Sequence, residues 1–281
     1  QALPHFLHEE AIIACAEHGR HVLTEKPLTT SVESAKAIAS AVKKAGIKFG
    51  IQHNYLHNPK LSAIYAAIRE GEIGRPIFIR DESFAAGHWP GAPGYDPDWR
   101  TSAGRAGGGA LIDSGYHSLY MCEQFMVTRV SDVAASICVT QEEGEVDDLS
   151  LVTLRHERGG ISSVQMSWAF EVGKGILEVH GSEGSITQGE GGSVLLCRKQ
   201  TGQWETYFEP DRKPSFRFTY SGSFLSFASA LQADRQPEVG LEAALHNLAI
   251  IMAAYESERT GSAISVTTLE HRMSAAAVLG A

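Results

Sequence analysis

The sequence predicts a short α/β unit with a parallel sheet in residues 1–55, followed by an α+β domain with a large, mostly antiparallel open sheet in residues 56–281. In the first part, helix and strand patterns alternate with short connections, which is typical of a doubly wound parallel sheet. In residues 131–208, strand patterns follow one another directly, with turns such as 157–160 between them, which indicates antiparallel hairpins.

The α/β unit contains two helix–strand pairs. Residues 8–18 form an amphipathic pattern that ends at Gly19, a residue suited to a helix C-terminus. A strand over 21–25 follows. Ser31 can cap a second helix that ends at Gly46, and residues 47–54 read as the next strand.

The rhythm changes after residue 55. A helix over 59–70 and a strand over 77–84 precede a long loop rich in Gly and Pro, and loops of this length are usually functional. We then expect a helix over 110–126. The remaining elements are a series of strands and two closing helices: strands 131–140, 148–156, 161–170, 176–180, 184–188, 193–199 and 203–208, and helices 221–233 and 241–260.

Composition argues against several classes of partner. The chain has 33 acidic and 24 basic residues, a net charge of -9, and no dense Lys/Arg run, so we expect neither nucleic acid nor a membrane surface as its main partner. It has no apolar stretch of about 18 residues. Its four cysteines are far apart in the sequence, which favours reduced thiols and a cytoplasmic location. No His, Cys or carboxylate cluster has the spacing of a metal site.

Three residues have the chemistry of a catalytic site. Lys26 follows a predicted parallel strand, where α/β proteins bind ligands. Asp113 and His117 are four residues apart on one predicted helix, so both side chains share a face. A carboxylate beside a histidine can fix the imidazole tautomer and create a general base. The alternatives are an Asp favoured by the helix dipole, a structural His and a solvated Lys.

Three segments in order resemble the Gfo/Idh/MocA oxidoreductases. HEEAIIACAEHGRHVLTEKPLTT (8–30) resembles the family stretch that ends in Glu-Lys-Pro, and GEIGRPIFI (71–79) resembles its turn into the second domain. GGGALIDSGYH (107–117) is similar to its G-G-G-x-L-x-D-x-G-x-H helix. With DWR (98–100) and SERTG (257–261), the resemblance covers nearly the whole chain. It identifies the first part as a portion of a Rossmann-type nucleotide-binding domain.

This resemblance implies an NAD- or NADP-dependent dehydrogenase that acts on a sugar or polyol. His117 would be the general base, Asp113 would orient it and contact the substrate, and Lys26 would hold the reacting oxygen. Trp99 has the alternative role of anchoring its loop. The residues expected at the cofactor are His8, Glu25, Lys26, Pro27, Asn54, Trp99 and Arg100.

The sequence departs from the family pattern in two places. Leu56 and His57 replace an arginine and an aromatic residue that are common there, so the substrate pocket can differ. No G-x-G-x-x-G fingerprint is present. We therefore expect the first strands of the Rossmann sheet to lie upstream of Gln1, the chain as given to bind dinucleotides poorly and to be inactive alone, and one of its strands at 21–25 or 47–53 to have an unpaired edge.

Two other functions stay open from the residues alone. One is a non-catalytic co-regulator that binds a sugar or a partner protein on the same fold, and the other is a purely structural oligomer subunit. We expect Lys26, Asp113 and His117 to converge on one cleft, and the open sheet to mediate homo-oligomerisation.

Overall fold

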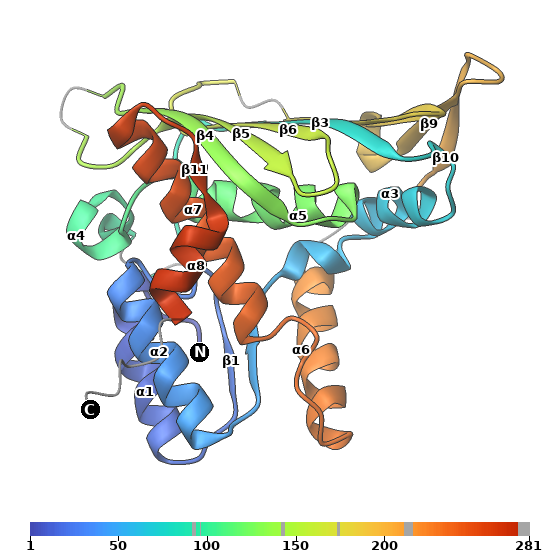
Figure 1. Ribbon diagram of the computed structural model, residues 1–281. Helices are drawn as coiled ribbons and strands as arrows, with labels where there is room; N and C mark the ends of the chain where they lie inside the picture. The colour runs from blue at the N-terminus through green and yellow to red at the C-terminus, as the bar shows by residue number, and fades with distance from the viewer. Residues whose placement is uncertain (92–93, 96, 142–143, 173–174, 211–215, 275–281) are drawn as a thin grey trace.

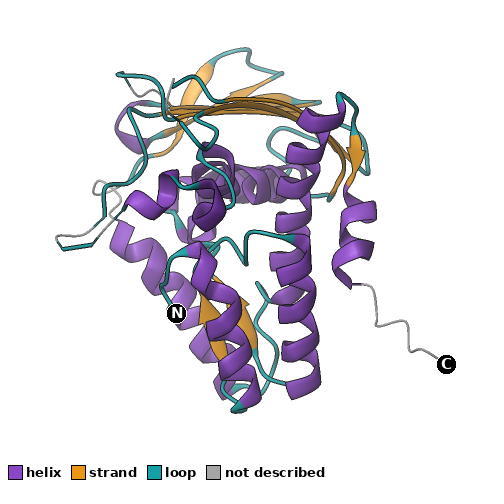
Figure 2. Ribbon diagram, turned by 90° about the vertical axis from the view of Figure 1, so that its left-hand side faces the viewer, coloured by secondary structure: helices purple, strands orange, loops and turns teal. Residues whose placement is uncertain are grey.

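The computed structural model describes residues 1–91, 94–95, 97–141, 144–172, 175–210 and 216–274 (Figure 1). A large sheet lies across one end of the molecule, helices cover one of its faces, and a small parallel sheet lies beyond those helices. Figure 2, turned by 90°, shows the same layers. This arrangement confirms the predicted order of an α/β unit followed by a domain with an open sheet.

The α/β unit is built on two short parallel strands, β1 (Val22–Thr24) and β2 (Phe49–Ile51). Helices α1 (His8–Glu17) and α2 (Val32–Ala45) pack on one side of it (Figure 1). Helix α6 (Phe216–Gln232) comes close on the other side, where a Cβ placed on Gly50 would lie 2.9 Å from the Phe227 ring. The predicted caps at Ser31 and Gly46 are confirmed.

The small sheet has two strands, so among the described residues the outer edge of each strand pairs with no further strand, as expected, and single backbone hydrogen bonds from other segments reach these edges. On one side, Glu25 N donates to Gln1 O over 3.0 Å. On the other side, Ile51 N donates to Val239 O over 3.1 Å. Sequence patterns do not reveal such cover, because Val239 is distant along the chain and forms no strand of its own.

The large sheet has nine strands in the order β10-β9-β8-β7-β3-β6-β5-β4-β11. All neighbouring pairs are antiparallel except β3 and β6, which are parallel. The strands are β3 (Pro76–Phe84), β4 (Val130–Cys138), β5 (Leu149–His156), β6 (Ile161–Ser167), β7 (Gly175–Gly181), β8 (Gly184–Gln188), β9 (Val194–Arg198), β10 (Trp204–Phe208) and β11 (Ile264–Ser265).

The predicted antiparallel sheet over 131–208 is confirmed, and two strands from outside this range, β3 and β11, join it. Strand β3 comes from outside this range and lies at the centre, between β6 and β7. A strand pattern does not reveal its partners, because pairing depends on where the connecting segments lead. The two-residue strand β11 and helix α8 (Val266–Ser274) were not predicted.

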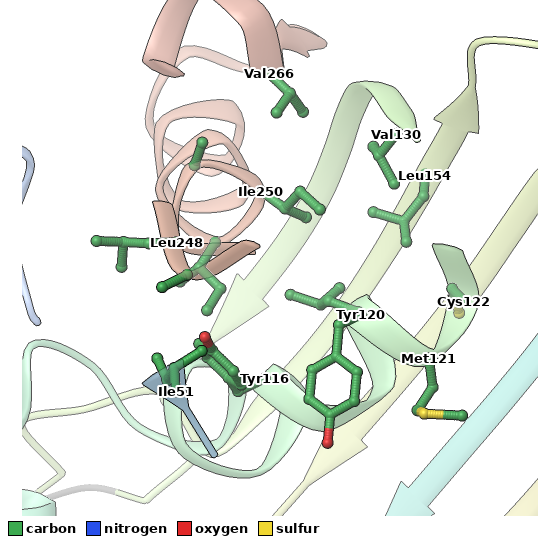
Figure 3. Packing of buried hydrophobic residues seen from close by; sticks show 14 of the residues in the cluster. Ile51, Tyr116, Tyr120, Met121, Cys122, Val130, Leu154, Leu248, Ile250 and Val266 are labelled. Atoms are coloured by element: carbon green, nitrogen blue, oxygen red, sulfur yellow. The ribbon is translucent and has the colours of Figure 1, made fainter. Parts of the chain in front are cut away.

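The main core lies between the sheet and the helices beneath it (Figure 3). Leu154 of β5, Leu248 and Ile250 of α7 (Leu241–Thr260) are fully buried, and Tyr120 of α5 (Tyr116–Met126) packs with them. Helix α3 (Pro59–Arg69) covers the same face farther along the sheet. This burial of apolar area fixes α5 against the sheet, and α5 carries part of the candidate site.

The start of the 110–126 helix differs from a plain α-helix. Leu111–Gly115 form a π-helical turn before α5, and the preceding loop contains a 3₁₀ turn at Asp98–Thr101 and a short helix α4 (Ala103–Ala106). Other short 3₁₀ turns lie elsewhere in the chain, at His5–Leu7, Asn54–His57 and Glu190–Gly192. A π turn inserts an extra residue into the helical repeat. Asp113 lies within that turn. The α-helical rule that residues four positions apart share a face therefore does not apply to Asp113 and His117.

Asp147 anchors this helix start. Its carboxylate accepts hydrogen bonds from Gly109 N (2.7 Å), Leu111 N (2.8 Å) and Tyr255 Oη (2.8 Å). A Cβ on Gly109 would lie 1.9 Å from the Asp147 carbonyl oxygen, so glycine is required at this close approach. The anchor thereby determines where Asp113 enters the site.

We expect Asp147→Ala to destabilise the protein by about 3 kcal/mol, because it leaves buried donors of Gly109, Leu111 and Tyr255 unpaired. Chemical denaturation with the fluorescence of buried Trp99 as readout measures this. Asp148→Ala is the matched control. It also removes a buried carboxylate, but that carboxylate accepts hydrogen bonds from Thr140 and Gln141 and none from the start of the helix that carries Asp113. An unchanged unfolding free energy in Asp147→Ala would contradict the anchor role.

Candidate active site

A cavity of about 820 Å³ lies where the α/β unit meets the sheet domain. Its walls include Glu25 and Lys26 at the carboxyl end of β1, together with Asp113 and His117 from the helix beneath the large sheet. Its size is typical of pockets for small organic ligands. The structure therefore brings Lys26, Asp113 and His117 together, as the sequence predicted.

Asp113 is the most heavily contacted of the three. Lys26 Nζ donates to Asp113 Oδ1 (2.5 Å) and also to the Asp113 carbonyl oxygen (2.6 Å). Arg100 Nη1 donates to Asp113 Oδ2 (2.5 Å). Burial by itself would raise the pKa of Asp113, but the charges of Lys26 and Arg100 outweigh it and hold that pKa well below its usual range. Asp113 is thus a permanent anion between two cations.

Aromatic rings fix the arginine. The Arg100 guanidinium carbon lies 4.5 Å from the ring centre of Trp99 and 5.8 Å from that of Trp89. The Trp99 side chain is buried and also meets His5 edge-on, with ring centres 4.5 Å apart. Stacking of this kind holds a guanidinium plane in one orientation. Trp99 therefore anchors its loop and positions Arg100 at the same time.

His117 has a different environment. Its Nδ1 lies 3.0 Å from Tyr120 Oη, and its ring stacks on Tyr55 with centres 4.2 Å apart. Burial lowers the pKa of His117 well below its ordinary value, and the charge of Lys26 lowers it further. The imidazole is therefore neutral at physiological pH, which is the form that can accept a proton.

Tyr120, and not Asp113, makes the hydrogen bond that orients His117. Both carboxylate oxygens of Asp113 are engaged by Lys26 and Arg100. Tyr120 Oη also accepts a hydrogen bond from Tyr55 N over 3.1 Å. When Tyr120 accepts from His117 Nδ1–H as well, the lone pair of the imidazole lies on Nε2. The sequence expectation for Asp113 differs because the π turn changes the facing of the two residues.

The other predicted residues separate into two groups. Glu25, Trp99 and Arg100 line the cavity. His8, Pro27 and Asn54 are not among the residues that line it: His8 Nδ1 lies 2.8 Å from the Pro27 carbonyl oxygen, and Asn54 Nδ2 donates to Thr219 Oγ1 over 3.1 Å. These three residues therefore contact other residues near the cavity and do not face it themselves.

Several residues of the site were missed from the sequence. Tyr55, Tyr120 and Tyr220 surround the cavity or His117, and His5 lies 3.9 Å from the Asp113 carboxylate. Burial lowers the pKa of His5 to about 3, so this ring is neutral. No local pattern marked these residues, since they come from four different elements.

In the described part of the chain, no helix is long and apolar enough to cross a membrane. No group of three or more His, Cys, Asp or Glu side chains there is arranged to hold a metal ion.

Lys26 at the carboxyl end of a parallel strand, its partner Asp113 and a neutral His117 share one cavity, and this arrangement fits the site of a nicotinamide-dependent oxidoreductase. Two family profiles match the chain. Residues 2–53 match the oxidoreductase family with an NAD-binding Rossmann fold, and residues 61–187 match the GFO/IDH/MocA C-terminal domain. The chain belongs to the Gfo/Idh/MocA family of NAD(P)-dependent oxidoreductases.

Relatives include enzymes with sugar substrates in their names. The chain is 28% identical over 272 residues to 1,5-anhydro-D-fructose reductase of Ensifer adhaerens, covering 93% of this chain and 77% of that protein. It is 31% identical over 249 residues to levoglucosan dehydrogenase of Pseudarthrobacter phenanthrenivorans, covering 79% of this chain and 61% of that protein.

A comparison of folds finds a similar enzyme. The structure of a levoglucosan dehydrogenase in complex with NADH and levoglucosan matches with a TM-score of 0.81 and 25% identity, over 94% of this chain and 78% of that one. The similarity includes both the α/β unit and the large sheet, because so much of this chain is covered.

We expect Tyr120→Phe to lower kcat about tenfold or more, because His117 Nδ1–H loses its acceptor. The protonated ring loses that acceptor too, which lowers the pKa of His117. The acid limb of the pH profile of kcat/KM should therefore move to lower pH. Tyr116→Phe is the control, since its hydroxyl bonds His53 Nε2 over 3.1 Å instead. An identical acid limb in wild type and Tyr120→Phe would refute the role of Tyr120.

Proposed function

We propose that this protein oxidises a carbinol of a sugar or polyol, or reduces the matching carbonyl, with NAD or NADP. One observation carries the proposal: a neutral His117 and the Lys26–Asp113 pair line one cavity at the carboxyl end of β1. The relatives that are named for sugar substrates support the substrate class.

The residues around the end of β1 fit the nicotinamide end of such a cofactor. Glu25, Lys26, Trp99 and Arg100 line this part of the cavity and would hold the ring beside the reacting carbon. The chemistry that a bound nicotinamide supplies is hydride transfer at that carbon. Burial raises the pKa of Glu25, and the charge of Lys26 partly offsets this effect.

His117 handles the proton. In the oxidation, Nε2 takes the proton of the substrate hydroxyl as the hydride leaves the same carbon, and a carbonyl forms. In the reduction, the imidazolium returns that proton to the oxygen. Since His117 Nδ1 is bonded to Tyr120, only Nε2 is available to the substrate.

Lys26 handles the charge on the reacting oxygen. Its ammonium group has three hydrogens, and the two hydrogen bonds to Asp113 leave one for a ligand. A cation held in a fixed position stabilises the negative charge that develops on oxygen as the proton moves. Asp113 keeps the ammonium in place and prevents it from binding elsewhere.

This division of roles favours an enzyme over a sugar-binding co-regulator. A binding protein needs hydrogen-bond partners, but it does not need an imidazole whose pKa is lowered beside a fixed cation.

We expect His117→Ala, made in the natural full-length enzyme, to lower turnover about 10²–10⁴-fold with little change in cofactor affinity. Steady-state assays of NADH formation with sugars and polyols measure the first quantity, and fluorescence titration of NADH measures the second. Because the pKa of His117 is lowered, kcat/KM of the wild type should stay constant as the pH falls through 6.5 and decline only in more acid solution.

Lys26→Met is the companion variant. Loss of the positive charge should raise the pKa of His117 and move the acid limb to higher pH, while turnover falls. Full turnover in His117→Ala at neutral pH, or an acid limb that Lys26→Met leaves in place, would rule out these roles.

We also propose that the open face of the large sheet joins two or more copies of the chain. In Figure 1, α3, α5 and α7 lie on one side of the sheet and no described α-helix lies on the other. Phe78, Leu151 and Ile161 of this face are 37%, 45% and 40% exposed, and Phe78 and Ile161 are paired in register. Apolar residues on a sheet face favour burial against a partner.

We expect the wild type to sediment as an oligomer at micromolar concentration, and a variant with Leu151→Glu and Ile161→Glu to sediment as a monomer. The control is Leu225→Glu on α6, which is 68% exposed and lies away from the sheet. A monomeric wild type would disprove association through this face.

The cellular location that we propose is the cytoplasm, where thiols stay reduced. The support is that Cys15, Cys122, Cys138 and Cys197 are all free.

A further inference from the structure

A cluster of charged side chains lies outside the cavity, where α5, α7 and α8 meet. Its members come from three helices and one connection: Glu123 of α5, Arg129 of the segment between α5 and β4, His246 of α7 and Glu270 of α8. The proposed hydride transfer uses none of them. At the centre is His246, whose buried ring depends on these neighbours for its hydrogen bonds, because little water reaches it.

Both nitrogens of the His246 ring face a carboxylate. Nε2 lies 2.6 Å from Glu123 Oε1, and Nδ1 lies 2.9 Å from Glu270 Oε1. An ionised carboxylate can only accept hydrogen bonds, and a neutral imidazole has only one N–H to donate. The protonated ring has two, so it can satisfy both carboxylates at once. In its charged form, His246 therefore joins α5 and α8 through α7.

The neutral ring makes a different set of bonds. Arg129 Nη2 lies 2.6 Å from His246 Nδ1 and donates to Glu270 Oε1 over 2.5 Å. When the imidazole is neutral, Nε2–H donates to Glu123 and the lone pair of Nδ1 accepts from Arg129. The lone pairs of Nδ1 and of Glu270 Oε1 then face each other. Glu270 keeps its ion pair with Arg129, but that side chain is 54% exposed, and such pairs contribute little stability.

The charges of the cluster balance when the ring is protonated. Glu123 and Glu270 carry two negative charges at neutral pH, and Arg129 supplies one positive charge. Among the described residues, no further charged side chain, from β4, α2 or elsewhere, forms an ion pair with His246. His156 of β5 also feels the charge of Glu123, but burial lowers its pKa and keeps that ring neutral. Burial opposes the charge on His246 as well, yet its bonds to the two carboxylates outweigh burial and raise its pKa.

Helix α8 connects the two parts of the molecule. It packs against α7 and β4 of the sheet domain and against α2 of the α/β unit (Figure 1). Its apolar side chains Val266, Leu269 and Met273 are buried. Glu270 lies between Leu269 and Met273 in the sequence, so a change in its bonds acts on the helix that joins α2 to the sheet domain. The cavity of the candidate active site lies where these two parts meet.

We propose that His246 is a pH switch that controls how firmly α8 holds the α/β unit to the sheet domain. The charged ring binds Glu123 and Glu270 and holds α8. When the ring loses its proton, it no longer binds Glu270, and α8 loosens from α2. Because the pKa of His246 is raised in the folded protein, this stabilisation is complete below the ordinary histidine value of 6.5 and is lost as the pH rises through the raised value.

The test measures hydrogen exchange of α8 in the natural full-length protein at about pH 6 and about pH 9. Protection factors, which are corrected for the direct effect of pH on exchange, should fall about tenfold or more in α8 between the two conditions, because a hydrogen bond to a charged group is lost. Protection of α3, which lies away from the cluster, should stay constant. His246→Gln cannot carry the charge and should show the low protection of α8 at both pH values.

The matched control is His271→Gln. This histidine also lies on α8, directly after Glu270, but its side chain is exposed. The variant should keep the pH dependence of the wild type. A wild type whose α8 is equally protected at both pH values would overturn the switch, and so would a pH dependence of α8 that survives in His246→Gln.

A second variant serves if His246→Gln does not fold. Glu270→Gln keeps the shape of the side chain and removes one of the two carboxylates, so the titration of the His246 ring, followed by NMR, should move to lower pH than in the wild type. The pH dependence of α8 protection should shrink in the same variant. A titration midpoint that Glu270→Gln leaves unchanged would overturn the switch. None of these measurements needs turnover, so their outcome is independent of the proposed reaction.

Discussion

The carboxylate of Asp113 is the point on which the site depends. It is buried, and a buried anion without compensation is strongly destabilising. Lys26 comes from the end of β1, and Arg100 comes from the loop before α4, so one carboxylate joins three segments that are far apart in the sequence. Because both partners must reach the same group, the α/β unit, the loop and the sheet domain share one geometry at the cavity.

The position of that carboxylate depends on the helix start behind it. Asp147 binds the backbone nitrogens of Gly109 and Leu111, and the π turn then presents Asp113 toward Lys26. One turn later, His117 is turned toward Tyr120 and Tyr55. The helix thus delivers a fixed anion and a neutral base to one cavity while keeping them apart. In the proposed reaction, this separation allows Lys26 to stabilise the charge on the reacting oxygen while His117 transfers the proton.

The large sheet serves the site as a wall and carries a second surface. Strand β3 lies at its centre, between β6 and β7, so Asp81 faces the cavity from the middle of the sheet. Residues on alternate positions of the same strands, such as Phe78, face the opposite side, where no described α-helix covers them. The alternation of side chains along a strand therefore separates the face that lines the cavity from the exposed apolar face that we propose for association.

The sequence by itself determined the order of the elements, the helix caps at Ser31 and Gly46, the antiparallel character of 131–208 and the meeting of Lys26, Asp113 and His117. These features depend on local patterns, such as periodicity and turn residues, and on the resemblance to known motifs. Only the tertiary structure decided that β3 lies at the centre of the sheet and that Gln1 and Val239 each form a backbone hydrogen bond with an edge of the small sheet. It also decided that Tyr120 orients His117 and that Lys60, Asp81 and Gln188 share the cavity. Each of these contacts joins residues whose facing depends on packing and on a π turn, and neither is encoded in the spacing of residues along the chain.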